Sequence, residues 1–313
     1  MKLHQLRSFK EILSHGFSLT RAAEHLNASQ PGLTRHVQLL EQELGTSLFE
    51  RDGKRLTGLT TSGAALRPIA ERILRDIDNL YRVAAEFAGG EVGSVVIAAS
   101  PTQARYGVPR FVRPFRDLFP NVRFELREGR SAQTREWLAE GLADFSISSA
   151  PSEPVPGLLF FAYSELHWIA LVRPEHPLLK RGPDVTLSDV ADHPLITYNA
   201  DYSSRAVLMR AFNRDGLTPD IVMSAPDADV MKKYVLSDLG VALVTHLAYD
   251  AGVDSGLLAI EIKHLIPSMT LSIGIRQPND LSNAARAMIN LIAPSVIGSM
   301  AIARNGGMPT TFR

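Results

Sequence analysis

The stretch that decides the fold is residues 22–63, AAEHLNASQPGLTRHVQLLEQELGTSLFERDGKRLTGLTTSG. Ser29 is a typical helix N-cap, and the run after it repeats apolar residues at helical spacing until Gly45 ends it as a C-cap. A shorter helix, capped by Ser18, precedes a tight connector. Two helices joined in this way predict a helix-turn-helix, with the second helix as the one that reads DNA.

Apolar spacing predicts which side chains form the core of this first domain. The helix after Ser29 is expected to bury Leu33, Val37, Leu40 and Leu44. Upstream, an amphipathic helix that ends at Gly16 is expected to carry Leu3, Leu6, Phe9, Ile12 and Leu13.

The other face of the helix after Ser29 carries side chains suited to base edges and phosphates. They are Gln30, Thr34, Arg35 and Gln38, and the predicted DNA-binding surface also includes Ser29 and Pro31 at the start of the helix. Any surface helix has a polar face, so this observation alone leaves both interpretations open. Residues 50–55, ERDGKR, then form a basic, glycine-containing turn. This pattern predicts a wing from which Arg51, Lys54 and Arg55 reach the phosphate backbone.

Residues 22–63 closely resemble the DNA-binding domain of LysR-type regulators. The matching positions are Ala22, Ala23, Leu26, Ser29, Gln30, Pro31, Leu40, Glu41, Leu44, Gly45, Leu48, Phe49, Arg51, Leu59, Thr60 and Gly63. The resemblance implies that Ser29, Gln30, Thr34, Arg35 and the basic residues of the wing contact double-stranded operator DNA. Ser29 also has the simpler role of a helix cap.

Composition restricts the alternatives. The first 60 residues hold eight Lys and Arg against six Asp and Glu, and the formal net charge of all 313 residues is zero. Charge therefore supports DNA binding little, and the argument depends on pattern. The absence of cysteine excludes disulfides and thiolate catalysis. The nine histidines have no metal-ligand spacing, so no metal or cofactor is expected. With no apolar run of membrane-spanning length and no signal peptide, we expect a cytoplasmic protein that does not enter membranes.

A heptad-like seam follows Gly63. Its positions are Leu66, Ala70, Ile73, Ile77, Leu80, Ala84 and Phe87. One helix cannot bury such a seam alone, so it packs either on a second copy or on the chain's own C-terminal part. We favour self-association, because a dimer can address two half-sites. Pro68 lies inside this helix, where it removes a hydrogen bond and costs about 3 kcal/mol unless the helix kinks.

The remaining chain alternates short apolar runs with helical patterns. This βαβ rhythm predicts mainly parallel sheets covered by helices, in two units of about 100 residues. The fold class expected is therefore multi-domain: an all-α winged helix-turn-helix with a long linker helix, then a two-lobed α/β, periplasmic-binding-protein-like effector domain. The boundaries expected are 1–60 for DNA binding, 61–88 for the linker and dimerisation helix, 89–293 for the effector domain and 294–313 for a C-terminal tail.

Lobe 1 of the effector domain is expected at about 94–163 and 269–293, and lobe 2 at about 164–268. By resemblance to LysR effector domains, the chain crosses between the lobes near 162–166 and 266–270. In the tail, Gly306, Gly307 and Pro309 are typical of flexible chain.

Hydroxyl-rich segments lie where predicted strands end and helices begin. They supply Ser100, Thr102, Gln103, Ser149, Tyr202 and Ser203. Free backbone N–H groups and hydroxyls at such places suit a sulfate, phosphate or carboxylate. Ordinary helix caps would look the same at any one segment.

Several segments, SPTQARYGVP, EHPL, PLITY, AFNRDGLTPDIVM and DADVMKKYV, resemble the cysteine-regulon activators of the LysR family, the CysB group. The resemblance implies control of sulfur assimilation or sulfonate use through a sulfate-like anion or O- or N-acetylserine, and a tetramer built as a dimer of dimers. By position, it assigns ligand contacts to Ser100, Thr102, Gln103, Ser149 and Ser203. The group has threonine where this chain has Ser100, Ser149 and Ser203. It also has a tryptophan in the cleft where this chain has Leu166, and the nearest tryptophan here is Trp168, two residues further on.

Three rival interpretations stay open. An enzyme is disfavoured, because no nucleophile elbow, phosphate loop or zinc-protease motif occurs. Arg105 and Arg205 could bind a substrate carboxylate, but no nucleophile–base pair stands near either. A two-lobed solute-binding protein for transport is disfavoured, because such a protein would not need the N-terminal DNA-binding unit. A LysR-type regulator of an unrelated pathway would share the fold but not the effector.

Overall fold

The computed structural model describes residues 1–53, 55–87 and 93–304. It divides into two compact units, Met1–Gly90 and Glu91–Arg313. We call these unit 1 and unit 2 and describe each by itself.

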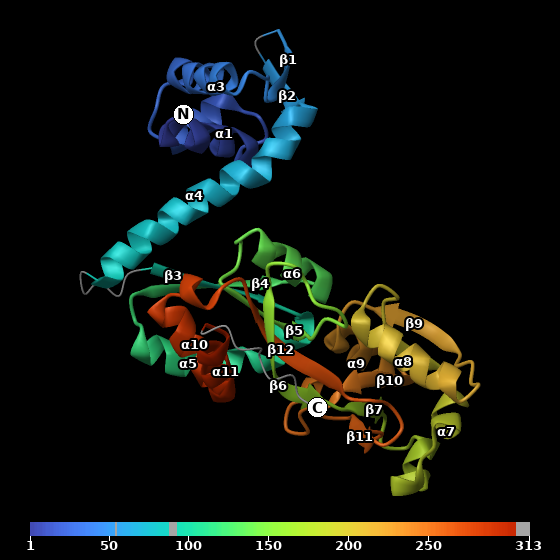
Figure 1. Ribbon diagram of the computed structural model, residues 1–313. Helices are drawn as coiled ribbons and strands as arrows, with labels where there is room; N and C mark the ends of the chain where they lie inside the picture. The colour runs from blue at the N-terminus through green and yellow to red at the C-terminus, as the bar shows by residue number, and fades with distance from the viewer. Residues whose placement is uncertain (54, 88–92, 305–313) are drawn as a thin grey trace. The chain divides into compact units, whose positions relative to one another are not determined.

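Unit 1 is a winged helix-turn-helix followed by a long helix (Figure 1). Its elements are α1 (Leu3–Ser14), α2 (Leu19–His25), α3 (Gln30–Leu44), β1 (Phe49–Asp52), β2 (Arg55–Leu59) and α4 (Thr61–Phe87). Ser18 and Ser29 cap α2 and α3 by accepting hydrogen bonds from Arg21 and Gly32. Gly45 ends α3 in the left-handed conformation, with a φ of 68°. The capping residues thus set both ends of α3.

The core of unit 1 contains the apolar side chains predicted from helical spacing, with two exceptions. Phe9, Ile12, Leu33 and Val37 are buried in it. Leu44 is instead 40% exposed and Leu3 is 41% exposed. The prediction of a buried Leu44 is wrong: apolar spacing continues to the last residue of α3, but the core of unit 1 does not cover it.

Helix α4 runs through Pro68 without interruption, and the pyrrolidine ring is exposed. The first half of the predicted seam packs within unit 1: Ala70 is buried in its core beside Leu74, which was not part of the seam, and Leu66 and Ile73 pack against this core. The second half is open: Leu80 of the seam is 65% exposed, and the neighbouring Tyr81 is 62% exposed. The side chain of Phe87 lies outside the described residues. The chain's own DNA-binding domain therefore covers half of the seam, a partner that the sequence did not indicate.

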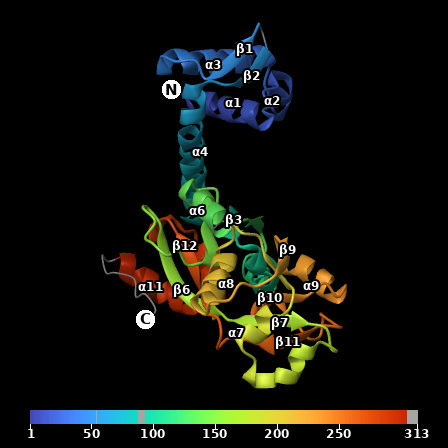
Figure 2. The ribbon, with the colours of Figure 1, turned by 90° about the vertical axis from the view of Figure 1, so that its right-hand side faces the viewer.

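Unit 2 consists of two α/β lobes, each with a five-stranded sheet (Figures 1 and 2). Lobe 1 contains β3 (Gly93–Ala99), η1 (Gln103–Gly107), α5 (Pro109–Leu118), β4 (Val122–Glu128), α6 (Ser131–Ala139), β5 (Phe145–Ser149), β6 (Leu159–Leu166), β12 (Met269–Ile275), η4 (Pro278–Asp280), α10 (Asn283–Ile292) and α11 (Pro294–Arg304). Lobe 2 contains β7 (Trp168–Val172), η2 (Pro177–Asp184), α7 (Leu187–Ala191), β8 (Leu195–Tyr198), α8 (Ser203–Arg214), β9 (Ile221–Ala225), α9 (Ala228–Leu236), β10 (Val241–Thr245), η3 (His246–Ala248) and β11 (Leu258–Glu261).

The sheets are mixed rather than mainly parallel, which corrects the expectation from the βαβ rhythm. The strand orders are β4-β3-β5-β12-β6 in lobe 1 and β11-β7-β10-β8-β9 in lobe 2. In lobe 1, β12 runs antiparallel to both β5 and β6. In lobe 2, β7 runs antiparallel to both β10 and β11. The reversed strands arise because the chain passes between the lobes twice, after β6 and before β12.

The segment expected to be a flexible tail begins as a helix. Val296 and Met300 of α11 are 1% and 2% exposed and belong to the core of lobe 1. In Figure 1, α5, α10 and α11 lie on one side of the lobe 1 sheet and α6 on the other. The tail residues Gly306, Gly307 and Pro309 lie outside the described residues. None of the described helices combines the length and apolarity needed to cross a membrane.

Candidate functional site

Helix α3 presents the predicted polar side chains on the side away from the core of unit 1. Gln30, Pro31, Arg35 and Gln38 are exposed. Thr34 is half-buried, and its hydroxyl donates to the Gln30 carbonyl at 3.1 Å. The Ser29 hydroxyl is likewise engaged as the cap of the helix. Of these polar side chains, the exposed ones that form no hydrogen bond within α3 among the described residues are the two glutamines and the arginine.

The wing is a two-stranded antiparallel ribbon in which Arg51 pairs with Leu56 and Asp52 with Arg55. Arg55 is exposed at its tip. Lys54, the third predicted phosphate contact, lies outside the described residues. The side chain of Arg51 is turned toward α3, where it donates to Glu41 at 3.0 Å. Arg51 thus holds the wing in place, a role that its charge alone did not indicate.

Glu41 connects the wing to α3 through three hydrogen bonds. One carboxylate oxygen accepts from the backbone N–H of Leu48 at 2.8 Å and of Phe49 at 3.3 Å. The other accepts from Arg51. The Glu41 side chain is only 13% exposed, so these bonds form where water competes little.

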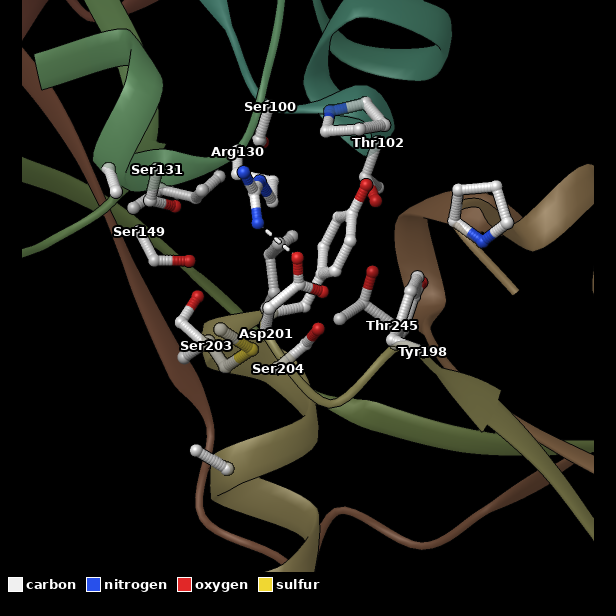
Figure 3. A pocket seen from close by; sticks show the side chains of 18 of the residues that line it. Ser100, Thr102, Arg130, Ser131, Ser149, Tyr198, Asp201, Ser203, Ser204 and Thr245 are labelled. Atoms are coloured by element: carbon white, nitrogen blue, oxygen red, sulfur yellow. Dashed lines mark hydrogen bonds and ion pairs between the residues drawn. The ribbon is translucent and has the colours of Figure 1, made fainter. Parts of the chain in front are cut away.

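A cavity of about 330 Å³ lies between the two lobes of unit 2. Figure 3 shows side chains from both lobes converging on it. Five of the six predicted effector contacts line it: Ser100, Thr102, Ser149, Tyr202 and Ser203. Segments separated by about a hundred residues therefore come together in one site.

Gln103, the sixth predicted contact, does not line the cavity. It begins the π-helical turn η1, and its side chain is 3% exposed. A Cβ at position 107 would lie 2.3 Å from the Gln103 amide oxygen, so Gly107 leaves the space that this side chain fills. Among the described residues the Gln103 amide nitrogen has no partner. The π turn directs Gln103 inward, where an ordinary helix start was expected.

Two helices begin at the cavity without side-chain caps. Arg130 precedes α6 and Tyr202 precedes α8, both with extended backbone and neither with a capping hydrogen bond. Ser131, Ser203 and Ser204 of the first turns line the cavity. Free N–H groups and the positive ends of the helix dipoles favour an anion there.

The charged side chains at the cavity are two arginines and one aspartate: Arg130, Arg135 and Asp201. Arg130 of lobe 1 forms an ion pair with Asp201 of lobe 2, drawn as a dashed line in Figure 3. The pair joins the lobes and leaves an excess of positive charge in the cavity.

Besides Asp201, lobe 2 lines the cavity with uncharged hydroxyls, among them those of Tyr198 and Thr245. Thr245 is 3% exposed, and its hydroxyl has no partner among the described residues. Burial raises the pKa of Tyr198 to about 12. The phenol therefore stays neutral at every physiological pH. These hydroxyls offer hydrogen bonds to an uncharged part of a ligand.

A second polar contact between the lobes lies at η1 and α9. Arg105 Nη1 is 3.2 Å from Asp229, and the Tyr106 hydroxyl donates to the same carboxylate. Lys232, whose side chain is 8% exposed, lies 2.9 Å from Asp254 and 3.3 Å from the Tyr106 hydroxyl. The sequence suggested that Arg105 could bind a substrate carboxylate. In the structure its guanidinium instead forms ion pairs with carboxylates of the protein.

Sequence reasoning missed Arg130, Arg135, Tyr198, Asp201 and Thr245. The available signal was positional, because Tyr198 ends β8 and Thr245 ends β10, at the strand ends where ligands gather. Leu166 lines the cavity, whereas Trp168 is fully buried and donates to the Pro267 carbonyl at 3.1 Å. The tryptophan thus supports a crossing between the lobes rather than the ligand.

Comparisons with known proteins agree with both units. Residues 3–64 match the bacterial regulatory helix-turn-helix protein, lysR family, and residues 88–296 match the LysR substrate binding domain. The HTH-type transcriptional regulator SsuR of Burkholderia cenocepacia is 39% identical, over 94% of this chain and 95% of its own. The regulator CysB of the same organism is 37% identical, over 95% and 94%. Among solved structures, the cofactor-binding domain of the Cbl transcriptional regulator is 33% identical with a TM-score of 0.64, covering 70% of this chain and 95% of that one.

Proposed function

The chain belongs to the LysR family of DNA-binding transcriptional regulators, and from this premise we propose that it controls genes of sulfur assimilation or sulfonate use. Relatives named SsuR, CysB and Cbl fit the CysB-like group. The observation that carries the proposal is the cavity between the lobes, where two uncapped helix N-termini meet an excess of arginine.

The effector we propose is a sulfate-like anion or O- or N-acetylserine. Helix N-termini, Arg130 and Arg135 suit the anionic group, since charge-assisted hydrogen bonds are the strongest available there. Ser100, Ser149 and Ser203 add hydroxyl donors. The uncharged hydroxyls of Tyr198 and Thr245 suit an acetyl or hydroxyl group, which favours acetylserine over a bare anion.

For DNA, we assign base contacts to Gln30, Arg35 and Gln38 of α3. We assign phosphate contacts to Arg55 and Lys54, with Ser29, Pro31 and Thr34 shaping the start of the helix. Arg51 contributes through the position of the wing. This division follows from exposure, because the exposed side chains are free to reach the grooves.

Regulation, in this proposal, is a shift between lobe arrangements. A ligand changes the arrangement only if it binds one form more tightly than the other. The Arg130–Asp201 pair supplies such a difference, since an anion competes with Asp201 for the same guanidinium. We propose that the shift alters the spacing of paired DNA-binding domains.

The assembly we propose is a dimer through the exposed half of α4, and a tetramer through further contacts of the effector domains. Leu80 and Tyr81 give this half an apolar surface that is exposed among the described residues of unit 1. We propose residues 1–60 as the DNA-binding domain, 61–88 as the linker and dimerisation helix and 89–293 as the effector domain. We also propose that the protein acts in the cytoplasm, where a bacterial regulator meets its DNA. Because no histidine or cysteine lines the cavity, we assign it binding rather than catalysis.

Calorimetric titration of the full-length protein tests the effector. Sulfate, thiosulfate, O-acetylserine and N-acetylserine are titrated separately, and at least one is expected to bind with one site per chain. Arg130→Ala serves as the matched cavity variant and should lose that heat. Binding by none of the four would overturn the sulfur assignment and leave a LysR-type regulator of another pathway.

A further inference from the structure

Two histidines and a glutamate that are not among the residues assigned to DNA converge in unit 1. Glu11 and His15 lie one turn apart at the end of α1, and His25 is the last residue of α2. One Glu11 carboxylate oxygen is 3.1 Å from His25 Nδ1 and 3.5 Å from His15 Nδ1. The two imidazole rings have centroids 5.1 Å apart.

These separations match those of ligands around one transition-metal ion. Bonds of about 2.0–2.1 Å in a tetrahedron place neighbouring ligand atoms roughly 3.3–3.4 Å apart. All three donor atoms lie within 4.8 Å of one another, so small side-chain rotations would complete the site. The side chains of Glu11 and His15 are 17% and 25% exposed, and that of His25 is 63% exposed. The set is therefore partly enclosed and still open to an entering ion.

We propose that Glu11, His15 and His25 bind a divalent transition-metal ion of the zinc type. Two imidazoles and one carboxylate favour zinc, cobalt or nickel over magnesium or calcium, which prefer oxygen ligands. A water molecule would complete the coordination. Binding requires His15 Nδ1 to leave the Glu11 carbonyl oxygen, 2.9 Å away, and this cost keeps the affinity below that of buried structural zinc sites.

The bound ion would tie α1 to α2. His25 directly precedes the turn that leads into α3, so the site fixes the first helix of the helix-turn-helix against the helix before it. Since the ion binds the folded unit and not the unfolded chain, it stabilises unit 1 in proportion to its free concentration. This inference departs from the expectation of no metal, which considered histidine spacing alone and not Glu11 beside His15.

The test uses tag-free, full-length protein. Zinc competition with a chromophoric chelator should give one site per chain, and cobalt should produce the visible absorption of a low-symmetry site. His25→Ala and Glu11→Gln should each weaken zinc binding by about tenfold or more. His4→Ala, which removes an exposed histidine from the same helix, should bind as the wild type does.

Thermal unfolding provides a readout independent of affinity. Zinc at a hundredfold excess over its dissociation constant should raise the Tm of unit 1 by about 5 °C or more, and EDTA should reverse the shift. The shift should fall by about half or more in His25→Ala, because the variant binds zinc about tenfold or more weakly while its exposed side chain can be removed without loss of packing. Equal binding by His25→Ala and His4→Ala, or no bound ion in the wild type, would overturn the proposal. The cluster would then be only a hydrogen-bonded contact between two helices.

Discussion

The guanidinium of Arg51 in the wing lies 3.0 Å from the carboxylate of Glu41 in α3. The same carboxylate accepts the N–H groups of Leu48 and Phe49, where the chain leaves the helix for the wing. The orientation of the wing is thus fixed by one side chain of the recognition helix α3.

Replacement of Glu41 by alanine should destabilise unit 1 by about 2–3 kcal/mol, because two backbone donors and one guanidinium lose their acceptor. Denaturant unfolding followed by circular dichroism measures this loss. Gln42→Ala, a change at the exposed neighbouring position, is the control and should stay within about 0.5 kcal/mol of the wild type. Equal losses in the two variants would contradict the role assigned to Glu41.

Arg35 and Arg55 should differ in how they affect DNA binding. With a DNA site selected in vitro by the protein itself, Arg35→Ala should cost about 1–3 kcal/mol and relax the preference at one base pair. Arg55→Ala should weaken binding to all DNA sequences alike. It should also reduce by about one the slope of the logarithm of the binding constant against the logarithm of the salt concentration. Fluorescence anisotropy over a salt series separates the two effects, with Lys263→Ala in unit 2 as control. Identical salt slopes for Arg55→Ala and wild type would exclude a phosphate contact by Arg55.

In the cavity, Arg130→Ala and Asp201→Asn should act in opposite directions. Loss of the guanidinium should reduce affinity for the anionic effector by about tenfold or more. Loss of the competing carboxylate should raise that affinity by roughly threefold, since Arg130 no longer has to leave a charged partner. Calorimetry with the best ligand measures both, and Arg123→Ala on β4, outside the cavity, is the control. A weaker ligand affinity in Asp201→Asn would mean that Asp201 contacts the ligand itself.

His36 should make unit 1 sensitive to acid. Burial, and then the neighbouring His4 at a ring distance of 4.4 Å, lower the pKa of His36. The folded state therefore binds fewer protons than the unfolded state, and stability should fall as the pH drops below about 6.5. His36→Asn keeps a donor near Ser8, whose hydroxyl lies 2.9 Å from His36 Nδ1, and removes the titration. The Tm of the variant should change less between pH 7.5 and 5.5, and an unchanged slope would refute the assignment.

Leu80→Asp should lower the assembly state without unfolding the chain, because Leu80 is 65% exposed. A charge in an apolar interface would be buried without a partner, which disfavours association. Sedimentation velocity should show a species of half the wild-type mass. Ile69→Asp, at another exposed apolar position on α4, indicates whether the effect is specific to the C-terminal half. Unchanged sedimentation of Leu80→Asp would place the dimer contact elsewhere.

Local signals predicted the elements well. Ser29 and Gly45 marked the ends of α3 because caps act within one turn of the chain. Strand ends at Ser100 and Ser149 led to the cavity because parallel strands share an edge. These features depend on neighbours in sequence or on general rules of α/β sheets.

What sequence could not supply depended on distant partners. Arg130 and Asp201 are 71 positions apart and meet only because the two lobes face each other. Gln103 stood at a predicted helix start, but the π turn rotated its side chain into the protein. The sequence indicated Glu41 only as part of a family pattern, because the groups that donate hydrogen bonds to its carboxylate lie in and just before the wing. The first half of the α4 seam packs against α1, and apolar periodicity alone does not show which element a seam packs against.

The position of β12 in the lobe 1 sheet has a consequence for biosynthesis. β12 separates β5 from β6 in that sheet, although it follows the whole of lobe 2 in the chain. As the polypeptide leaves the ribosome, all strands of the lobe 2 sheet are available once β11 has emerged, while β6 still awaits the strand it pairs with. We therefore expect the lobe 2 sheet to form before the lobe 1 sheet, which is completed only when β12 emerges.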